Sequence, residues 1–171
     1  DFKSFQGRKL IGFAPFSTHT EKMYPLDKMK NVISEVNINK DWQVVFLGSK
    51  SEAAILDEWQ SLFPGTISIA GKYSFTDELS IISNLSGMVS MDSANVHLAC
   101  LFNVPVITIW GPTHPYAGFA GWNQPPENFV QLDLDCRPTS IYGNKPCHCN
   151  GKSCIGDISE EMILEKIKSI F

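Results

Sequence analysis

The sequence predicts an α/β fold in which a parallel sheet lies between two layers of helices. Segments with the composition of strands alternate with segments whose apolar residues recur at helical spacing, and this alternation is typical of βαβ units. Two strand-like segments, 42–48 and 104–110, are almost continuously apolar, as expected for strands covered on both faces. The 171 residues suffice for one domain with a sizeable core.

The strands follow from short apolar runs that end at glycine or at polar residues. They are expected at 8–16, 42–48, 66–71, 87–91 and 104–110, with a last edge strand at 129–134. Between residues 111 and 128 the alternation stops, and the chain becomes a long loop rich in glycine, proline and aromatic residues. Loops of this length are usually functional or mobile.

The helices follow from apolar periodicity and from start signals. They are expected at 25–36, 51–63, 76–85, 94–102 and 158–170. Pro25 suits the first turn of the first helix. Ser74 with Asp77 marks the start of the third helix, and Asp157 with Glu160 marks the start of the last.

Composition narrows the class of protein. A charged fraction of 19% with a hydrophobic fraction of 43% is typical of a soluble globular domain. The net charge of -4 argues against nucleic acid as the partner. No apolar run approaches the roughly 20 residues that span a bilayer, and no secretory signal is visible. Because the chain begins at Asp1, we expect it to be part of a longer protein.

Polar residues gather where the expected strands end. In an open parallel sheet, ligands bind at the carboxyl ends of the strands. The residues at these ends are Ser17, Thr18, His19 and Lys22; Gly48, Ser49 and Glu52; Gly71, Lys72 and Tyr73; Asp92, Ser93 and Ala94; and Gly111, Pro112, Thr113 and His114. One edge of the sheet therefore suits a polar ligand.

The segment MDSANVH (91–97) indicates an anion site. Ser93 suits the N-cap of a helix, and the next residues would offer free backbone N–H groups where the helix dipole favours an anion. Ala94 is small enough for a phosphate to approach the backbone, so a diphosphate is the expected ligand. The alternative interpretation is a plain N-cap, which needs no ligand.

Three further residues belong to the same hypothesis. His97 lies one turn into the helix, Lys22 would neutralise phosphate charge, and Asp92 would accept a hydrogen bond from a sugar hydroxyl. The alternatives are a core histidine, a solvated lysine and a turn aspartate. The chain has neither a Gly-x-Gly-x-x-Gly sequence nor a Walker-type loop. The common sequence motifs of dinucleotide-binding proteins and of P-loop NTPases are therefore absent.

The motifs together resemble a known family. DSANVHLA (92–99) and VPVITIWGPTHP (104–115) are similar in order and spacing to Asp-Ser/Thr-Gly-x-x-His-Leu-Ala and Gly-Pro-Thr-x-Pro of family 9 glycosyltransferases, the ADP-heptose:lipopolysaccharide heptosyltransferases. KMYP (22–25), VFLGSKSE (45–52) and AGKYS (70–74) also resemble that family. The resemblance covers nearly the whole chain.

The resemblance implies a GT-B enzyme, which has two Rossmann-like domains with the active site between them. Residues 1–171 would be the C-terminal domain, which binds the nucleotide-sugar donor, and the N-terminal acceptor domain with the general base would be absent. The implied substrates are an ADP-heptose-like donor and a lipopolysaccharide core or related surface glycan. The implied location is the cytoplasm, at the inner face of the bacterial membrane, and catalysis would need no cofactor.

By the same resemblance, each candidate residue acquires a role. The diphosphate would be held by Lys22, Ser93 and the Ala94 amide, with Ser17 and Thr18 nearby. The nucleoside would lie against Glu52 and Tyr73. The sugar or the leaving diphosphate would be faced by Asp92 and His97. The chain departs from the family at Ala94 and Tyr24, which replace glycine and tryptophan, and in the segment HPYAGFAGW (114–122). These departures leave the identity of the sugar open.

Four of the five cysteines fall in one loop, at about 136–156. Cys136, Cys147, Cys149 and Cys154 have the number of ligands for a structural zinc, but not its usual paired spacing. Disulfides are the alternative. Cys100 is expected to be an inert core residue.

Two other functions remain open at this level. One is a sugar-nucleotide epimerase of the same architecture, which Gly-Pro-Thr-x-Pro disfavours. The other is a non-catalytic interaction module held by a metal loop, which predicts metal binding without nucleotide affinity. We expect no turnover by this chain alone.

Overall fold

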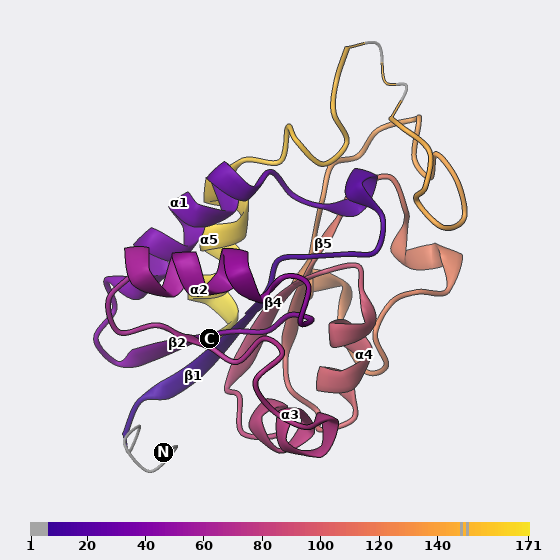
Figure 1. The fold of residues 1–171 in the computed structure, drawn as a ribbon. Helices are drawn as coiled ribbons and strands as arrows, with labels where there is room; N and C mark the ends of the chain where they lie inside the picture. Colours follow the sequence, from indigo (N-terminus) through magenta and orange to yellow (C-terminus); the bar gives the residue numbers. More distant parts are fainter. Residues whose placement is uncertain (1–6, 148, 150) are drawn as a thin grey trace.

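The computed structural model describes residues 7–147, 149 and 151–171, so His148, between two of the cysteines, lies outside the described residues. A parallel sheet of order β3-β2-β1-β4-β5-β6 forms its centre (Figure 1). The strands are β1 (Lys9–Ala14), β2 (Trp42–Phe46), β3 (Ile67–Ser68), β4 (Gly87–Met91), β5 (Val106–Trp110) and β6 (Phe129–Gln131). The helices are α1 (Leu26–Asn37), α2 (Ala53–Leu62), α3 (Phe75–Ile82), α4 (Ala94–Cys100) and α5 (Glu160–Ile170).

The helices cover both faces of the sheet, as the apolar strands predict. Buried residues of α1, α2 and α5 pack with Phe13, Phe46 and Ile109 in one core, whereas α3 and α4 pack with Leu10, Val45 and other strand residues in a second core. The two sets alternate along each strand because successive side chains point to opposite faces. The predicted three-layer α/β architecture is therefore confirmed.

The strand order reverses between β1 and β4, and this reversal decides where a ligand can bind. The chain runs outward from β1 to β3 on one side and from β4 to β6 on the other. The two central strands pair in parallel, with Ala14 opposite Ser90, so the loops that follow them begin side by side. Such a reversal leaves a crevice at the carboxyl ends of the strands.

Several elements are shorter than predicted. The expected strand 66–71 pairs only at Ile67–Ser68, and the expected helix 94–102 ends at Cys100. The edge strand β6 covers Phe129–Gln131 rather than 129–134. Because apolar composition continues past the point where a strand finds a hydrogen-bonding partner, composition overestimates these lengths.

The start signals have mixed outcomes. Ser74 caps α3 as predicted, because its hydroxyl accepts a hydrogen bond from the Asp77 amide at 3.2 Å. The expected pair Asp157 and Glu160 is wrong: the Ser159 hydroxyl caps α5. Asp157 instead accepts a hydrogen bond from the Ser153 amide at 2.9 Å, so its carboxylate closes the preceding loop.

Candidate functional site

A cavity of about 270 Å³ lies at the point where the strand order reverses. Its floor comes from the loop after β1, the loop after β4 and the first turn of α4. The lining residues are Ser17, Thr18, His19, Lys22, Asp92, Ser93, Ala94, His97, Phe119 and Tyr142. Seven of the nine residues expected to hold the donor thus surround one cavity, and their individual roles stay predictions.

An ion pair at the base of the cavity links two loops that are far apart in sequence. The Lys22 ammonium lies 2.7 Å from Oδ2 of Asp92, and the two side chains are only 13% and 6% exposed. The Thr113 hydroxyl donates a second hydrogen bond to the same oxygen at 2.7 Å. Asp92 is therefore fixed by a cation from one side of the sheet reversal and by a buried hydroxyl from the other.

The loop after β4 also receives a contact from the loop after β1. The Ser17 hydroxyl donates to the Asp92 carbonyl at 3.2 Å, which holds the two loops together. Ser93 occupies the N-cap position of α4, but its side chain makes no capping hydrogen bond, contrary to expectation. Its hydroxyl lies 3.3 Å from that of Ser90, and Ala94 and His97 are exposed beside it.

The remaining two predicted residues do not line this cavity. The carboxylate of Glu52 accepts a hydrogen bond from the Ser49 amide at 2.6 Å, so it closes the turn between β2 and α2. Tyr73 is 46% exposed beyond the end of β3. A smaller cavity of about 170 Å³ lies on this side of the sheet and is lined by Gly48, Ser49, Asn95 and other residues.

Sequence reasoning missed the contribution of the loops after β5. Thr113 stood among the strand-end residues, but nothing in its motif indicated that it would bond Asp92. Phe119 and Tyr142 carried no local signal at all, and both line the cavity. Tyr142 reaches it from the cysteine-bearing loop, whose place beside Lys22 is a property of the tertiary structure (Figure 1, orange).

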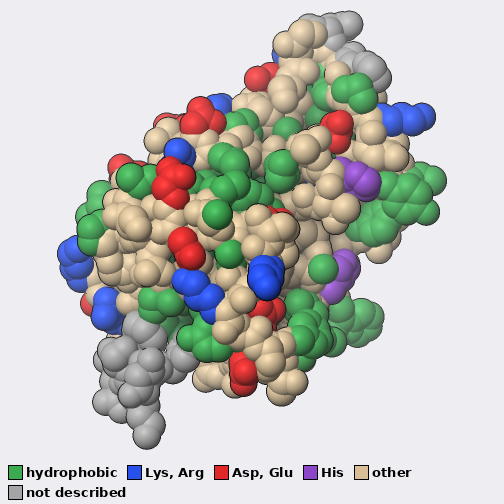
Figure 2. Space-filling view, viewed as in Figure 1, with side chains coloured by type: hydrophobic (Ala, Val, Ile, Leu, Met, Phe, Trp, Pro, Cys, Tyr) green, Lys and Arg blue, Asp and Glu red, His purple; other side chains and the backbone are tan. Residues whose placement is uncertain are grey.

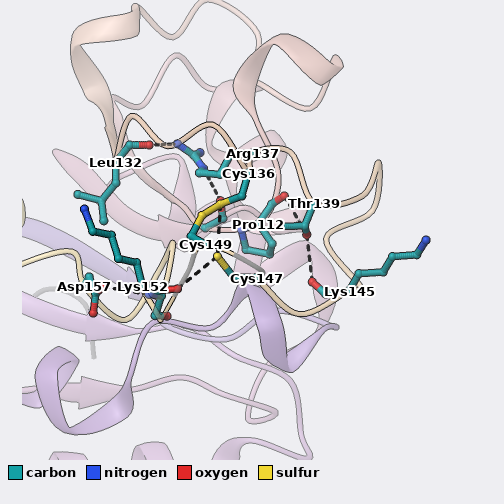
Figure 3. The surroundings of a disulfide bond; sticks show 12 residues. Pro112, Leu132, Cys136, Arg137, Thr139, Lys145, Cys147, Cys149, Lys152 and Asp157 are labelled. Atoms are coloured by element: carbon teal, nitrogen blue, oxygen red, sulfur yellow. Dashed lines mark hydrogen bonds between the residues drawn. A yellow bond between two sulfur atoms is a disulfide. The ribbon is translucent and has the colours of Figure 1, made fainter.

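Arg137 ties the cysteine-bearing loop to the loop after β5. Its guanidinium donates to the carbonyls of Gly111 at 2.6 Å and Thr113 at 2.9 Å, and also to that of Leu132 (Figure 3). Burial lowers the pKa of Arg137, although a guanidinium stays charged at neutral pH. The cation thus satisfies backbone acceptors that the loops would otherwise leave unpaired.

The cysteines form a cluster beside Arg137. Cys136 and Cys149 are joined in a disulfide, and the Cys147 sulfur lies 3.5 Å from that of Cys136 (Figure 3). Cys154 is buried. Burial, together with a hydrogen bond to Cys147, raises the pKa of Cys154 to about 12. Cys100, the last residue of α4, is buried in the core, as predicted.

The Cys147 thiol differs from its neighbours in acidity. Burial alone would raise its pKa, but hydrogen bonds involving Cys154 and the backbone at Cys149 outweigh burial and lower it. Burial raises the pKa of Cys100. Among the three thiols outside the disulfide, Cys147 therefore has the largest thiolate fraction near neutral pH.

Hydrophobic side chains gather beside the histidines at the right of Figure 2. Among the exposed apolar residues of the long loop are Tyr116 and Trp122, which are 87% and 82% exposed.

In the part of the chain that the structure describes, no helix has both the length and the apolar character needed to cross a bilayer.

Comparison with known proteins gives a match to one protein family. Residues 1–146 match the model of glycosyltransferase family 9 (heptosyltransferase). The chain is 22% identical over 170 residues to lipooligosaccharide heptosyltransferase 2 of Campylobacter jejuni, covering 96% of this chain and 52% of that protein. It therefore spans about half the length of this curated relative.

Solved structures share the fold. ADP-heptose LPS heptosyltransferase II of E. coli superposes with a TM-score of 0.75 at 19% identity, over 99% of this chain and 49% of that one. Heptosyltransferase WaaC of E. coli with ADP-2-deoxy-2-fluoro heptose gives 0.69 at 17% identity, over 98% and 47%. The six-stranded sheet with its helices thus matches one half of a GT-B heptosyltransferase.

Proposed function

Because the chain belongs to glycosyltransferase family 9, we propose that it is the domain that binds the nucleotide-sugar donor of a surface-glycan glycosyltransferase. The donor would be ADP-heptose or a close analogue, the molecule bound in analogue form by the similar WaaC. The acceptor, a lipopolysaccharide core or related glycan, would be bound by a second domain. The proposal treats residues 1–171 as one donor-binding domain.

The cavity at the strand reversal carries this proposal. It brings a cation, three hydroxyl side chains and the start of α4 to one place at the carboxyl ends of β1 and β4. Ligands of open α/β sheets bind at this position. Lys22 supplies positive charge for a diphosphate, and the hydroxyls of Ser17, Thr18 and Ser93 supply hydrogen bonds.

The chemistry that fits this cavity is stabilisation of a leaving diphosphate. Transfer of a sugar leaves negative charge on the departing nucleoside diphosphate, and fixed donors placed at that charge lower the barrier. Lys22 would bind this charge, and Asp92 would hold the lysine in place and face the sugar with His97. The acceptor hydroxyl must lose a proton, and the general base for this step would come from the other domain.

A titration of the purified chain with ADP, UDP and GDP tests the proposal. We expect saturable binding of ADP, measured by calorimetry, and a loss of at least about tenfold in affinity for Ser93→Trp, because the indole would fill the cavity. Ser61→Trp is the matched control, because Ser61 is exposed on α2. Its affinity should equal that of the parent chain.

Two outcomes would contradict the proposal. If none of the three nucleotides binds to the folded protein, this domain does not bind the donor. Equal affinity of the parent chain and Ser93→Trp would place the nucleotide elsewhere. If UDP or GDP binds more tightly than ADP, the proposed location of the donor pocket stands, but the donor carries a different base.

The cysteine cluster supports a second, structural proposal: in the reduced chain it holds a zinc or iron ion. The sulfurs of Cys136, Cys147 and Cys149 all lie within 4.8 Å of one another, and Cys154 is near enough to Cys147 to influence its pKa. Thiolates about 2.3 Å from a zinc ion would lie roughly 3.7 Å apart, so the three sulfurs of Cys136, Cys147 and Cys149 are close enough together to share one ion. The disulfide uses two of these sulfurs, so metal and disulfide exclude each other.

Metal content and thiol reactivity test the metal proposal together. Protein purified without air is expected to hold about one zinc or iron per chain by mass spectrometry, and Cys147→Ser to hold much less. In oxidised, metal-free protein, iodoacetamide should label Cys147 before Cys100 and Cys154, because those two thiols are buried and Cys147 is partly exposed. Cys100→Ser should keep the metal, and metal-free parent protein would contradict the proposal.

A further inference from the structure

The cavity has aromatic as well as polar lining. Beside Lys22, Asp92 and Ser93, the rings of Phe119 and Tyr142 also line it. The centroids of these two rings are 6.3 Å apart and their planes are inclined by 54°. Phe119 comes from the long loop after β5, in the segment where the chain departs from the family pattern, and Tyr142 comes from the cysteine-bearing loop.

The backbone that carries Tyr142 is packed against the ion pair. Gly143 is buried and has a positive φ of 66°, and a Cβ there would lie 2.7 Å from Thr113 and 2.8 Å from the Lys22 side chain. Two hydrogen bonds between Ser140 and Asn144 close this turn. The turn therefore holds Tyr142 next to the two residues that fix Asp92.

The backbone around Phe119 is anchored on α4 in a similar way. Gly118 has a positive φ of 92°. A Cβ on Gly121 would lie 2.5 Å from the Cys100 sulfur and 2.8 Å from the Val96 side chain, so this segment packs directly on the helix. Both rings are thus placed by turns that contact the elements bearing the polar groups of the cavity.

The two rings suit a sugar better than a flat base. A sugar has hydroxyl groups at its edge and C–H groups on its faces, so it packs a face on an aromatic ring while its hydroxyls reach polar groups. Rings inclined by 54° form a corner rather than a parallel slot, which fits a puckered ring and not a planar one. Tyr142 is 63% exposed, so its ring is available to a ligand.

We propose that Phe119 and Tyr142 form the platform for the sugar ring of the donor and discriminate among donor sugars. The inference rests on the proposed function, because it places the diphosphate at Lys22 and the sugar beside it. Phe119 and Tyr142 would pack against the C–H face, and Asp92 and His97 would meet the hydroxyls. A change at either ring would then alter sugar affinity and leave nucleotide affinity unchanged.

Calorimetry with ADP and with ADP-heptose, on the parent chain and on Phe119→Ala and Tyr142→Ala, separates these contributions. We expect ADP affinity to stay within about twofold of the parent value. ADP-heptose affinity should fall by about fivefold to tenfold in each variant, as expected for loss of one aromatic packing surface. Tyr142→Phe keeps the ring and should retain the parent affinity for ADP-heptose.

Tyr116→Ala is the matched control, because Tyr116 belongs to the same loop as Phe119, is 87% exposed and does not line the cavity. It should leave both affinities unchanged. Unaltered ADP-heptose affinity in both alanine variants would overturn the inference alone, and so would equal losses for ADP and ADP-heptose. Failure of the parent chain to bind ADP, UDP or GDP would overturn the proposed function and this inference together.

Discussion

Replacing Lys22 by methionine is expected to weaken ADP binding by about 30-fold or more, the size of effect seen when one partner of a buried charge contact is removed. Two causes act in the same direction. The diphosphate loses its cation, and the Asp92 carboxylate, which the ammonium neutralises at 2.7 Å, is left to repel the ligand. Calorimetry with ADP measures the loss.

The same variant is expected to lower the free energy of unfolding by about 3 kcal/mol, because a buried carboxylate loses its counter-ion. Among the residues that the structure describes, Asp92 then keeps the Thr113 hydroxyl as the one side-chain donor to its Oδ2. The double variant Lys22→Met/Asp92→Asn removes both charges and should recover part of the stability, while ADP binding stays weak. Urea unfolding followed by circular dichroism measures the stability of each variant.

Lys72→Met is the matched control, because Lys72 forms a similar ion pair with Asp57 at 2.8 Å with both side chains more than 40% exposed. Exposed pairs contribute little, so its stability should change by no more than about 0.5 kcal/mol and its ADP affinity not at all. Parent-like ADP affinity in the Lys22→Met/Asp92→Asn double variant would show that the lysine charge does not bind the diphosphate.

Replacing Trp59 by alanine is expected to destabilise the fold by about 3–5 kcal/mol, a large part of the stability of a domain of this size. Trp59 on α2 is 2% exposed, and its ring contacts those of Phe16 and Phe46, with centroid distances of 6.4 and 6.0 Å. Truncation leaves a cavity that these rings cannot fill. Because Phe16 directly precedes Ser17, the loop after β1 should also lose support.

Urea unfolding by circular dichroism gives the size of the Trp59 effect. Trp122→Ala is the control with the same change of side chain, because Trp122 is 82% exposed. It should alter the free energy of unfolding by no more than about 0.5 kcal/mol. Similar losses for the two variants would contradict the assignment of Trp59 to the core.

Much of the fold could be predicted because local pattern and burial agree in it. Continuous apolar runs such as VITIW (106–110) belong to strands covered on both faces, and the Ser74 cap follows from residues three positions apart. Element ends were less accurate. The length of β3 depends on how many of its backbone groups pair with β2, which the local sequence does not show. The start of α5 depends on which of several neighbouring polar side chains caps it, and Ser159 does so.

The site could be predicted in part for the same reason. Parallel strands end at one edge of the sheet, so polar residues directly after β1 and β4 had to approach one another, and those residues now surround the cavity. Glu52 and Tyr73 follow β2 and β3, on one outer side of the strand reversal, and do not reach it.

The sequence by itself determined the alternating elements, the parallel sheet, the edge of the sheet at which polar residues gather and the family to which the chain belongs. Only the tertiary structure decided that Lys22 pairs with Asp92, that Arg137 binds the loop after β5, and that Phe119 and Tyr142 meet at the cavity. The physical reason is the range of the interactions. Periodicity and caps act within a few residues, whereas these contacts depend on the paths of long loops, which buried hydrogen bonds and glycine turns fix only in the folded chain.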